Sequence, residues 1–418
     1  MSCHRKANDI MPSITQHRDL RTGQPIWLDR RRPALPFGPL RRSIHADVLV
    51  IGAGISGAII AEQLCDAGLK VVIVDRRAPV TGSTAASTAL LQYEIDTPLS
   101  HLAARIGTER AERIWRRSKL AVDALRERSE RLGIAADQAT RSSLYLNGNV
   151  LDAAGLAAEA DARRRAGFEV GLLKPAALAD RFGISGRHAI VSHGNYVADP
   201  RRLAVGFLNA AIRQGARLYS PVDIIGFETS AAGVTAGTFG GAVITATTAI
   251  FATGYEMLKG IPDNGNRIIS TWSIATRPQP RRIWPGSAII WEAADPYLYI
   301  RTTASGQVIC GGEDEDIADA AERDAKLADK CALLSRKLGQ LLPMIDATPT
   351  HCWAGSFGDN VHGMPTVGPL PDMPGCYAAM GYGGNGITFS MMAGQMLRGM
   401  ITGTGDPDLD LVSFDRKF

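Results

Sequence analysis

Runs of apolar residues bounded by glycine or polar residues define most of the elements that this chain is expected to form. Residues 48–51 and 69–74 are apolar without interruption, which is typical of strands buried on both faces. The segment between them opens with glycines and continues with Ala61, Leu64 and Gly68 at helical spacing. The order strand, helix, strand predicts a βαβ unit with two parallel strands.

Later parts of the chain show the same two periods. A helix is expected over residues 200–215, and an alternating pattern from Tyr297 to Arg301 predicts a strand that places Tyr297, Tyr299 and Arg301 on one face. Amphipathic spacing predicts one long, solvated outer helix over 100–132 and one long helix over 318–342. Further strands are expected at residues 217–219, 224–228, 233–238 and 243–251 and within 267–312, and a last helix at 387–401.

Three glycines in the βαβ unit form a G-x-G-x-x-G turn. Gly52 permits the tight turn, Gly54 lets the backbone approach a pyrophosphate, and Gly57 lets the helix pack closely on the strand. The N-terminus of the helix offers N–H groups and a positive dipole end to the phosphates. Asp75 ends the second strand and is placed to accept hydrogen bonds from a ribose diol. The unit therefore predicts a dinucleotide site, and either NAD or FAD would satisfy it.

Small residues mark three other places where backbone is expected near a ligand. Residues 81–88 are a run of small and hydroxyl residues, suited either to contact phosphate or ring oxygens or to form a surface loop. The strand at 243–251 ends in Ala252-Thr253-Gly254, as strands do where they abut a cofactor. Residues 381–386 form a second glycine-rich loop before a helix, which a simple NAD domain does not need.

Bulk properties exclude several classes of protein. The chain has 418 residues, 45% of them hydrophobic and 21% charged, with a net charge of +4, too small to indicate nucleic-acid binding. Its six cysteines form no C-x-x-C pair, which argues against a zinc site and a disulfide scaffold and favours a reducing compartment. No apolar run is long enough to span a membrane, and no secretory signal is found, so a cytoplasmic protein is expected. No metal is expected.

Four stretches make the chain resemble a known family, the FAD-dependent D-amino-acid oxidase/glycine oxidase/sarcosine oxidase superfamily, and in particular its γ-glutamylputrescine oxidoreductase-like members. They are the glycine fingerprint with Asp75, the segment 197–201 (V-A-D-P-R), the segment 353–368 (from W-A-G to G-M-P-T-V-G) and the loop 381–386. Trp27-Leu28-Asp29 resembles the family's N-terminal arm, and Trp27 is expected to be a packing anchor.

The resemblance implies an α/β fold with two domains. One is a Rossmann-like FAD-binding domain of the glutathione-reductase type, and the other is a substrate domain built on a mixed or antiparallel sheet. We expect residues 45–95, 185–258 and 346–405 in the FAD-binding domain and residues 96–184 and 259–345 in the substrate domain and its helical connections. Residues 1–44 would form an arm and residues 406–418 a tail.

The resemblance also implies that the cofactor is FAD. Sarcosine oxidases bind their flavin through a cysteine, and Gly355 stands at that position here, so non-covalent FAD is expected. The expected cofactor-binding residues are Gly52, Gly54, Ile55, Ser56, Gly57, Asp75, Arg76, Gly82, Ser83, Thr84, Ser87, Val222, Thr253, Gly254, Gly355, Gly383, Gly384, Asn385, Gly386, Ile387 and Thr388.

Arg301, Tyr297 and His362 are the expected catalytic residues. Arg301 and Tyr297 fall on the strand where glycine oxidase-like enzymes hold a substrate carboxylate, and a guanidinium matches a carboxylate through two parallel hydrogen bonds. An arginine exposed at a sheet edge is an equally good interpretation of Arg301. His362 is a candidate base. Gly384 replaces a second arginine of the family, which weakens the case for a carboxylate site.

Other residues leave the type of enzyme open. Ile309 occupies the position of a lysine that assists reaction with oxygen, so the electron acceptor is either O2 or an electron-transfer partner. Tyr93, Trp272 and Tyr382 suit a substrate pocket or the core equally. The acidic run at 313–316 is interpreted as solvated surface before a helix.

The sequence therefore predicts an FAD-dependent oxidoreductase that oxidises the C–N bond of an amino acid or secondary amine by hydride transfer to flavin. Two alternatives remain open. One is a 2-hydroxy acid or polyol-phosphate dehydrogenase on the same fold, and the other is a non-catalytic FAD-holding subunit of a dehydrogenase complex. The oligomeric state is not determined by the sequence.

Overall fold

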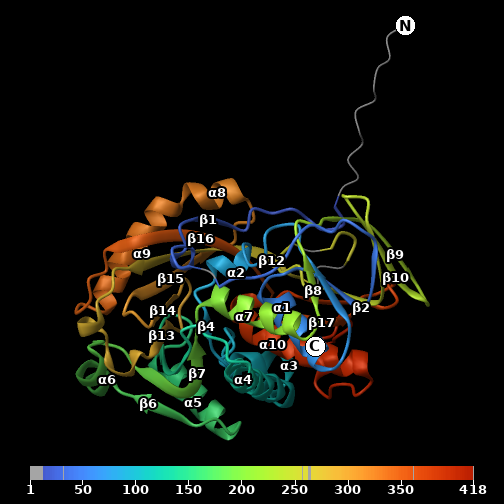
Figure 1. Cartoon of the computed structure of the whole chain (residues 1–418). Helices are drawn as coiled ribbons and strands as arrows, with labels where there is room; N and C mark the ends of the chain where they lie inside the picture. Colours follow the sequence, from blue (N-terminus) through green and yellow to red (C-terminus); the bar gives the residue numbers. More distant parts are fainter. Residues whose placement is uncertain (1–12, 32, 257, 262–264, 361, 418) are drawn as a thin grey trace.

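The strands of the chain form two sheets that lie side by side in the computed structural model, which describes residues 13–31, 33–256, 258–261, 265–360 and 362–417 (Figure 1). The first sheet has a parallel core in the order β8, β3, β2, β11, β18, with β17 antiparallel at its end and the β9–β10 hairpin joined to β11. Its strands are β2 (Ile44–Ile51), β3 (Val71–Val74), β8 (Arg217–Tyr219), β9 (Ile224–Ser230), β10 (Gly233–Thr238), β11 (Val243–Phe251), β17 (Thr366–Pro369) and β18 (Cys376–Met380).

Three helices pack together beside the first sheet: α1 (Ile55–Asp66), α7 (Pro200–Arg213) and α10 (Gly386–Thr402) (Figure 1). Almost every residue of α1 is buried, because this helix lies between the sheet and the two other helices. Burial of a side chain such as Ile59, which is fully buried, stabilises the fold by about 1.5–3 kcal/mol. The predicted βαβ unit is thus confirmed.

The second sheet is mixed, with β5 and β13 parallel and its other described pairs antiparallel. Its strands are β1 (Arg21–Gly23), β4 (Leu90–Leu91), β5 (Ala139–Leu146), β6 (Val170–Leu173), β7 (Ala189–Val197), β12 (Arg267–Thr276), β13 (Ile289–Glu292), β14 (Leu298–Thr302), β15 (Val308–Glu315) and β16 (Pro349–Asp359). Helix α9 (Leu327–Leu341) packs on β12, β15 and β16 (Figure 1). The expected α/β class, with one parallel and one mixed sheet, is confirmed.

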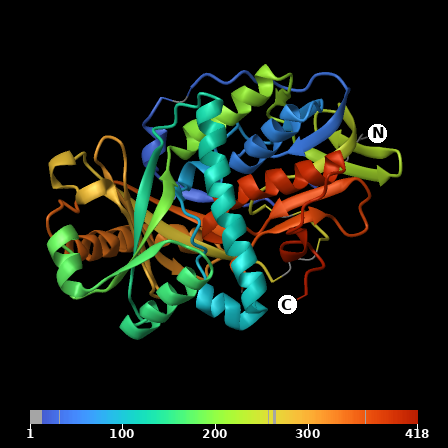
Figure 2. The ribbon, with the colours of Figure 1, turned by 90° about the horizontal axis from the view of Figure 1, so that it is seen from below.

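The long helix expected at 100–132 is interrupted. It consists of α3 (Leu99–Ile106) and α4 (Thr108–Arg131), because Gly107 between them has a φ of +88°. Helix α4 runs between the two halves of the molecule (Figure 2) and is not simply a solvated helix, since its Arg128 is buried and forms an ion pair with the buried Glu62 of α1.

The helix expected at 318–342 is likewise divided, into α8 (Ala320–Ala325) and α9, at Lys326. The remaining helices are α2 (Ser83–Ala86), α5 (Ala153–Arg165) and α6 (Pro175–Phe182).

The sheets differ from the expected domain ranges at four strands. Strands β4, β7 and β16 were expected in the FAD-binding domain, but they pair with strands of the second sheet. The described part of the arm contributes the fourth, β1, to the edge of that sheet beside β16. Trp27 is 1% exposed and packs with Ile309 and Trp353, as expected of an anchor.

Candidate active site

A first cavity, here called the nucleotide cavity, lies where the parallel strands β2, β3 and β11 end. This is the edge at which α/β sheets bind dinucleotides. Twelve residues that the sequence predicted for cofactor binding line it: Gly52, Gly54, Ile55, Ser56, Asp75, Arg76, Gly82, Ser83, Thr84, Val222, Thr253 and Gly254.

The glycine turn allows the backbone segments around this cavity to lie unusually close. Gly52 has a φ of +117°, and a Cβ atom built on Gly57 would lie 1.8 Å from the carbonyl oxygen of Gly52. Gly57 does not line the cavity but lets α1 start directly against the turn. Gly54 has no side chain to cap α1. The Thr84 hydroxyl accepts from the backbone N–H of Ile55 at 3.0 Å, and later N–H groups of the first turn can bind an anion.

Polar groups in the nucleotide cavity fit a dinucleotide. The Asp75 carboxylate accepts hydrogen bonds from the backbone N–H groups of Ala53 and Arg77, both at 2.8 Å, and retains acceptor capacity for a ribose diol. Burial raises the pKa of Asp75, and those two hydrogen bonds oppose the shift. The Thr253 hydroxyl oxygen is buried without a hydrogen-bond partner in the described part of the chain, as expected of a group that meets a ligand.

A second cavity, here called the central cavity, adjoins the first, because Ile55, Ser56, Ser83, Thr84 and Gly254 line both. It lies between the two sheets: α2 and the loop before α10 contribute one part of its wall, and strands β12, β14, β15 and β16 contribute another. Its other lining residues from the predicted set are Ser87, Tyr297, Gly355, Gly383, Gly384, Asn385, Gly386 and Ile387. Thr388 lies behind the wall, 1% exposed, and its hydroxyl donates to the carbonyl of Gln92 at 3.0 Å.

Arg301 does not line either cavity. Its guanidinium is buried and donates to the carbonyls of Ala89 and Ala198, both at 2.8 Å, and to that of Thr88 at 3.2 Å. Thr88 and Ala89 themselves line the central cavity, so their backbone separates Arg301 from it. Arg301 therefore supports the cavity wall and does not make the expected contact with a substrate carboxylate. Burial lowers the pKa of Arg301 to about 9.

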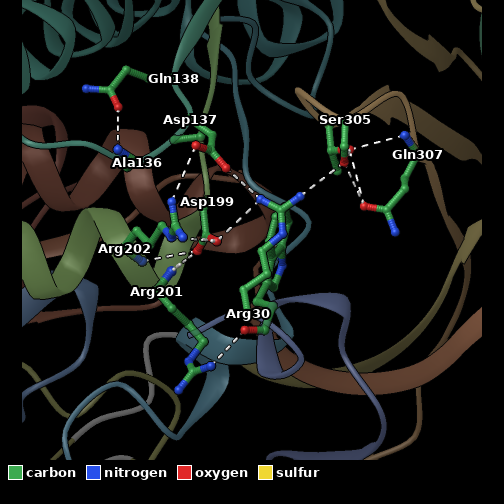
Figure 3. A network of polar contacts seen from close by, with 12 residues as sticks. Arg30, Ala136, Asp137, Gln138, Asp199, Arg201, Arg202, Ser305 and Gln307 are labelled. Atoms are coloured by element: carbon green, nitrogen blue, oxygen red, sulfur yellow. Dashed lines mark hydrogen bonds and ion pairs between the residues drawn. The ribbon is translucent and has the colours of Figure 1, made fainter. Parts of the chain in front are cut away.

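The segment 197–201, which carried part of the family resemblance, has a structural role near Arg301 (Figure 3). Asp199 is 1% exposed and caps α7, accepting from the backbone N–H groups of Arg201 at 3.0 Å and Arg202 at 3.1 Å. Arg30 of the arm lies 3.8 Å from Asp199 and 2.7 Å from Asp137. These contacts fasten the arm to the start of α7.

His362, the candidate base, does not line the central cavity. It follows β16, and burial together with Arg416 and Arg105 lowers its pKa. His351 contacts the Asp29 carboxylate at 2.6 Å and thus holds part of the arm to β16. Of the three aromatic candidates, Tyr382 lines the central cavity, whereas Trp272 and Tyr93 are buried in the core.

The interpretation of the acidic run at 313–316 as solvated surface was wrong for its first two residues. Strand β15 continues to Glu315 and bulges at Glu313, which has a φ of +57° where the register with β12 shifts. Glu313 is 3% exposed and pairs with Lys337 of α9, while Asp314 lines the central cavity. Lys326, Lys330 and Lys337 recur at helical spacing after the run, and this signal could have revealed that a helix covers the strand.

Sequence reasoning also missed most of the polar and aromatic groups in the half of the cavity formed by the second sheet. They come from separate strands and loops: Gln92, Asp96, Tyr255, Thr271, Trp291, Tyr299, Ser356 and Phe357. Except for the adjacent Ser356 and Phe357 of β16, each comes from a different segment, and only the fold brings them together. Tyr299 and Thr271, for example, lie on β14 and β12 and share a hydrogen bond of 3.1 Å between their hydroxyls.

Two carboxylates in this half have unusual proton affinity. Burial raises the pKa of Asp314 to about 7; hydrogen bonds from Thr271 and Tyr297 and the charge of Lys330 oppose the shift, and Asp96 adds to it. Partial desolvation also raises the pKa of Asp96, but this residue is exposed at the edge of the cavity, and the backbone N–H of Gly384 donates to its carboxylate at 3.0 Å and opposes the shift. Such groups are typical of functional sites.

Within the described residues, no helix is long and apolar enough to cross a membrane, and no cluster of His, Cys, Asp and Glu could hold a metal ion.

Comparison with known proteins agrees with the geometry. The family model described as FAD dependent oxidoreductase (DAO) matches residues 47–400. The chain is 23% identical to the probable oxidoreductase OrdL of Haemophilus influenzae, over 90% of this chain and 88% of that protein. It is 24% identical to the gamma-glutamylputrescine oxidoreductase of Escherichia coli, over 89% and 87% of the two chains. The glycine oxidase structure from Geobacillus kaustophilus superposes with a TM-score of 0.72 at 20% identity, covering 90% of this chain and 99% of that one.

Proposed function

Because the chain belongs to the FAD dependent oxidoreductase (DAO) family, we propose that it oxidises the C–N bond of an amine or amino acid to an imine, which water then hydrolyses. The observation that carries the proposal is the shared wall of the two cavities. A dinucleotide held by the nucleotide cavity would extend along Ser56, Ser83 and Gly254 into a second space lined by tyrosines and carboxylates. FAD, when bound, supplies the acceptor for a hydride.

The chain's own residues would orient the substrate and exclude water. Tyr255, Tyr297, Tyr299 and Trp291 supply large rigid surfaces, so a bound amine would be held with few free rotations. The loop Gly383–Asn385 and the start of α10 lie in the same wall. The Gly384 N–H donates to Asp96 at 3.0 Å, and the positive helix end favours negative charge.

The lining of the central cavity favours an amine over a hydroxy acid or a polyol phosphate. Its described lining residues include Asp96 and Asp314 but no lysine, arginine or histidine. An anionic substrate would therefore meet two carboxylates without a cation to balance it, and a desolvated charge needs such a partner.

An anaerobic reduction screen tests the proposal. The FAD-loaded protein would receive amines, amino acids, hydroxy acids and polyol phosphates in turn, and loss of the visible flavin absorbance would be followed. Bleaching by amines or amino acids is the expected result. Bleaching by a hydroxy acid or polyol phosphate alone would contradict it, and a flavin that no compound bleaches would favour a subunit that needs a partner.

A further inference from the structure

The far half of the central cavity combines negative charge with aromatic walls. Asp314 lies among Tyr297, Tyr299 and Thr271, and the Tyr255 ring lines the same space. Carboxylates next to aromatic faces are a known arrangement for binding ammonium groups, because the ring faces and the carboxylate both attract positive charge.

Asp314 keeps one oxygen available for a ligand. The hydroxyls of Thr271 and Tyr297 lie near its carboxylate and oppose the rise of its pKa. The Thr271 hydroxyl also shares a hydrogen bond of 3.1 Å with that of Tyr299. The Oδ1 atom of Asp314 is buried and has no hydrogen-bond partner in the described part of the chain. A buried charged oxygen without a partner is costly, and a bound cation would compensate it.

Nearby cations do not neutralise Asp314. Lys330, the charged group that opposes its pKa shift, is engaged elsewhere: its Nζ lies 2.7 Å from Glu315 and donates to the carbonyl of Glu313 at 2.8 Å. Within the described residues, neither Asp314 nor Asp96 forms a salt bridge, although the other three acids of the run, Glu313, Glu315 and Asp316, do.

A second, independent observation points to a ligand in this cavity. Gln92 is 7% exposed and lines the cavity, yet its side-chain Nε2 has no hydrogen-bond partner in the described part of the chain. Asp96 lies at the exposed side of the same cavity, where Gly384 holds one of its oxygens. The cavity thus offers one sheltered and one outer carboxylate.

We propose that the central cavity selects an amine that carries a second positive group and no carboxylate, with Asp314 binding the sheltered ammonium group and Asp96 the outer one. This inference rests on the function proposed above and names its substrate class. It agrees with the position of Arg301, which donates to backbone carbonyls. A guanidinium in the cavity wall would repel a cationic substrate.

The sheltered ammonium group would also need to lose a proton before its carbon can give up a hydride, because a protonated amine has no lone pair to stabilise the developing imine. One N–H proton would pass to Asp314, leaving a neutral amine and a neutral carboxylic acid, with no change in total charge. A carboxylate with a pKa of about 7 suits this transfer near neutral pH.

The first experiment measures binding without turnover. The FAD-loaded protein would be titrated in a calorimeter with butyltrimethylammonium, a cation that has no lone pair to oxidise, and with hexanoate, an anion of similar chain length. We expect the cation alone to bind. Asp314→Asn should weaken its binding about tenfold or more, and Asp96→Asn, at the exposed side, by about threefold.

Asp316→Asn is the matched control, because Asp316 belongs to the same acidic run but pairs with Arg267 with 63% of its side chain exposed. It should leave the dissociation constant of the cation unchanged. Tighter binding of hexanoate than of the cation, or equal cation affinity in Asp314→Asn and the unmodified protein, would overturn the inference.

The second experiment compares the anaerobic bleaching rates produced by diaminobutane, butylamine and gamma-aminobutyrate, which share a reacting end and differ in the distal group. We expect the rates to fall in that order. Fastest bleaching by gamma-aminobutyrate would refute the inference while leaving C–N oxidation intact. Cation binding that depends on Asp314 without bleaching by any amine would instead refute the proposed function and leave the cation site standing.

Discussion

The raised pKa of Asp314 makes a quantitative prediction about stability. The pKa rises from 3.8 to about 7 on folding, so the folded protein binds the proton more tightly than the unfolded chain does. Well below the unfolded pKa both states are protonated and no penalty exists, and near pH 4 the penalty is still less than about 1 kcal/mol. As the pH rises from about 4 to about 7, the unfolded chain releases the proton first, and the free energy of unfolding falls by about 1.4 kcal/mol per pH unit.

The total loss is about 4 kcal/mol above pH 7, from a shift of about 3 units. The substitution Asp314→Asn removes the charge and keeps the shape of the side chain. We therefore expect the variant to match the unmodified protein near pH 4 and to exceed its free energy of unfolding by about 4 kcal/mol near pH 8. Asp96 is present in both proteins, and because its charge adds to the shift of Asp314, the difference between them includes the interaction of the two carboxylates.

Urea unfolding of the FAD-loaded protein at a series of pH values, followed by tryptophan fluorescence, measures this difference. Asp316→Asn serves again as control and should change the free energy of unfolding by less than about 1 kcal/mol at every pH, because its ion pair with Arg267 is exposed. If the free energies of unfolding of Asp314→Asn and the unmodified protein change in parallel with pH, Asp314 is not desolvated. The argument that its charge is sheltered in the cavity would then be wrong.

Four further outcomes are expected. Gly57→Ala should yield protein without flavin absorbance, because the added Cβ would lie 1.8 Å from the oxygen of Gly52; retention of full flavin content would contradict this. Arg301→Met should lower the free energy of unfolding, measured in urea, by about 3 kcal/mol through lost hydrogen bonds, without weakening cation binding. Trp27→Ala should cost about 3–5 kcal/mol in the same assay if the arm is part of the fold, and an unchanged midpoint would show that it is not. Because Ile309 packs under Trp27 and the described lining of the central cavity has no lysine, flavin reduced by substrate should reoxidise slowly when air is admitted, as stopped-flow absorbance would show.

The cofactor half of the site could be predicted because its signals are local in the sequence. The turn from Gly52 to Gly57, the helix after it and Asp75 follow one another within a single βαβ unit, so their spacing fixes their geometry. The loop before α10 is likewise a continuous run. Nearly all predicted cofactor-binding residues line one of the two cavities, and the two that do not, Gly57 and Thr388, lie directly behind the wall.

The substrate half could not be predicted in the same way, because strand pairing assembles it. Thr271, Tyr299 and Asp314 lie on three neighbouring strands, β12, β14 and β15, and no spacing along the chain brings them together. Arg301 illustrates the same difficulty. The alternating pattern placed it two residues from Tyr299 on the same strand, but the segment at Thr88 and Ala89, more than two hundred residues away in sequence, covers it and takes its hydrogen bonds.

The acidic run at 313–316 shows which structural features a local sequence pattern can predict and which it cannot. Because β15 extends through it, neighbouring acids take different environments: Glu313 and Glu315 pair with lysines of α9 and the residue before it, whereas Asp314 faces the cavity. The spacing of the lysines could have indicated a helix that covers the strand. It could not have indicated that Asp314 lacks a counterion. A sheltered carboxylate without a counterion lowers stability in the free protein, and such a cost is typical of a group whose charge serves a ligand. The position of Asp314 is therefore better explained by a cationic substrate than by the folding of the chain.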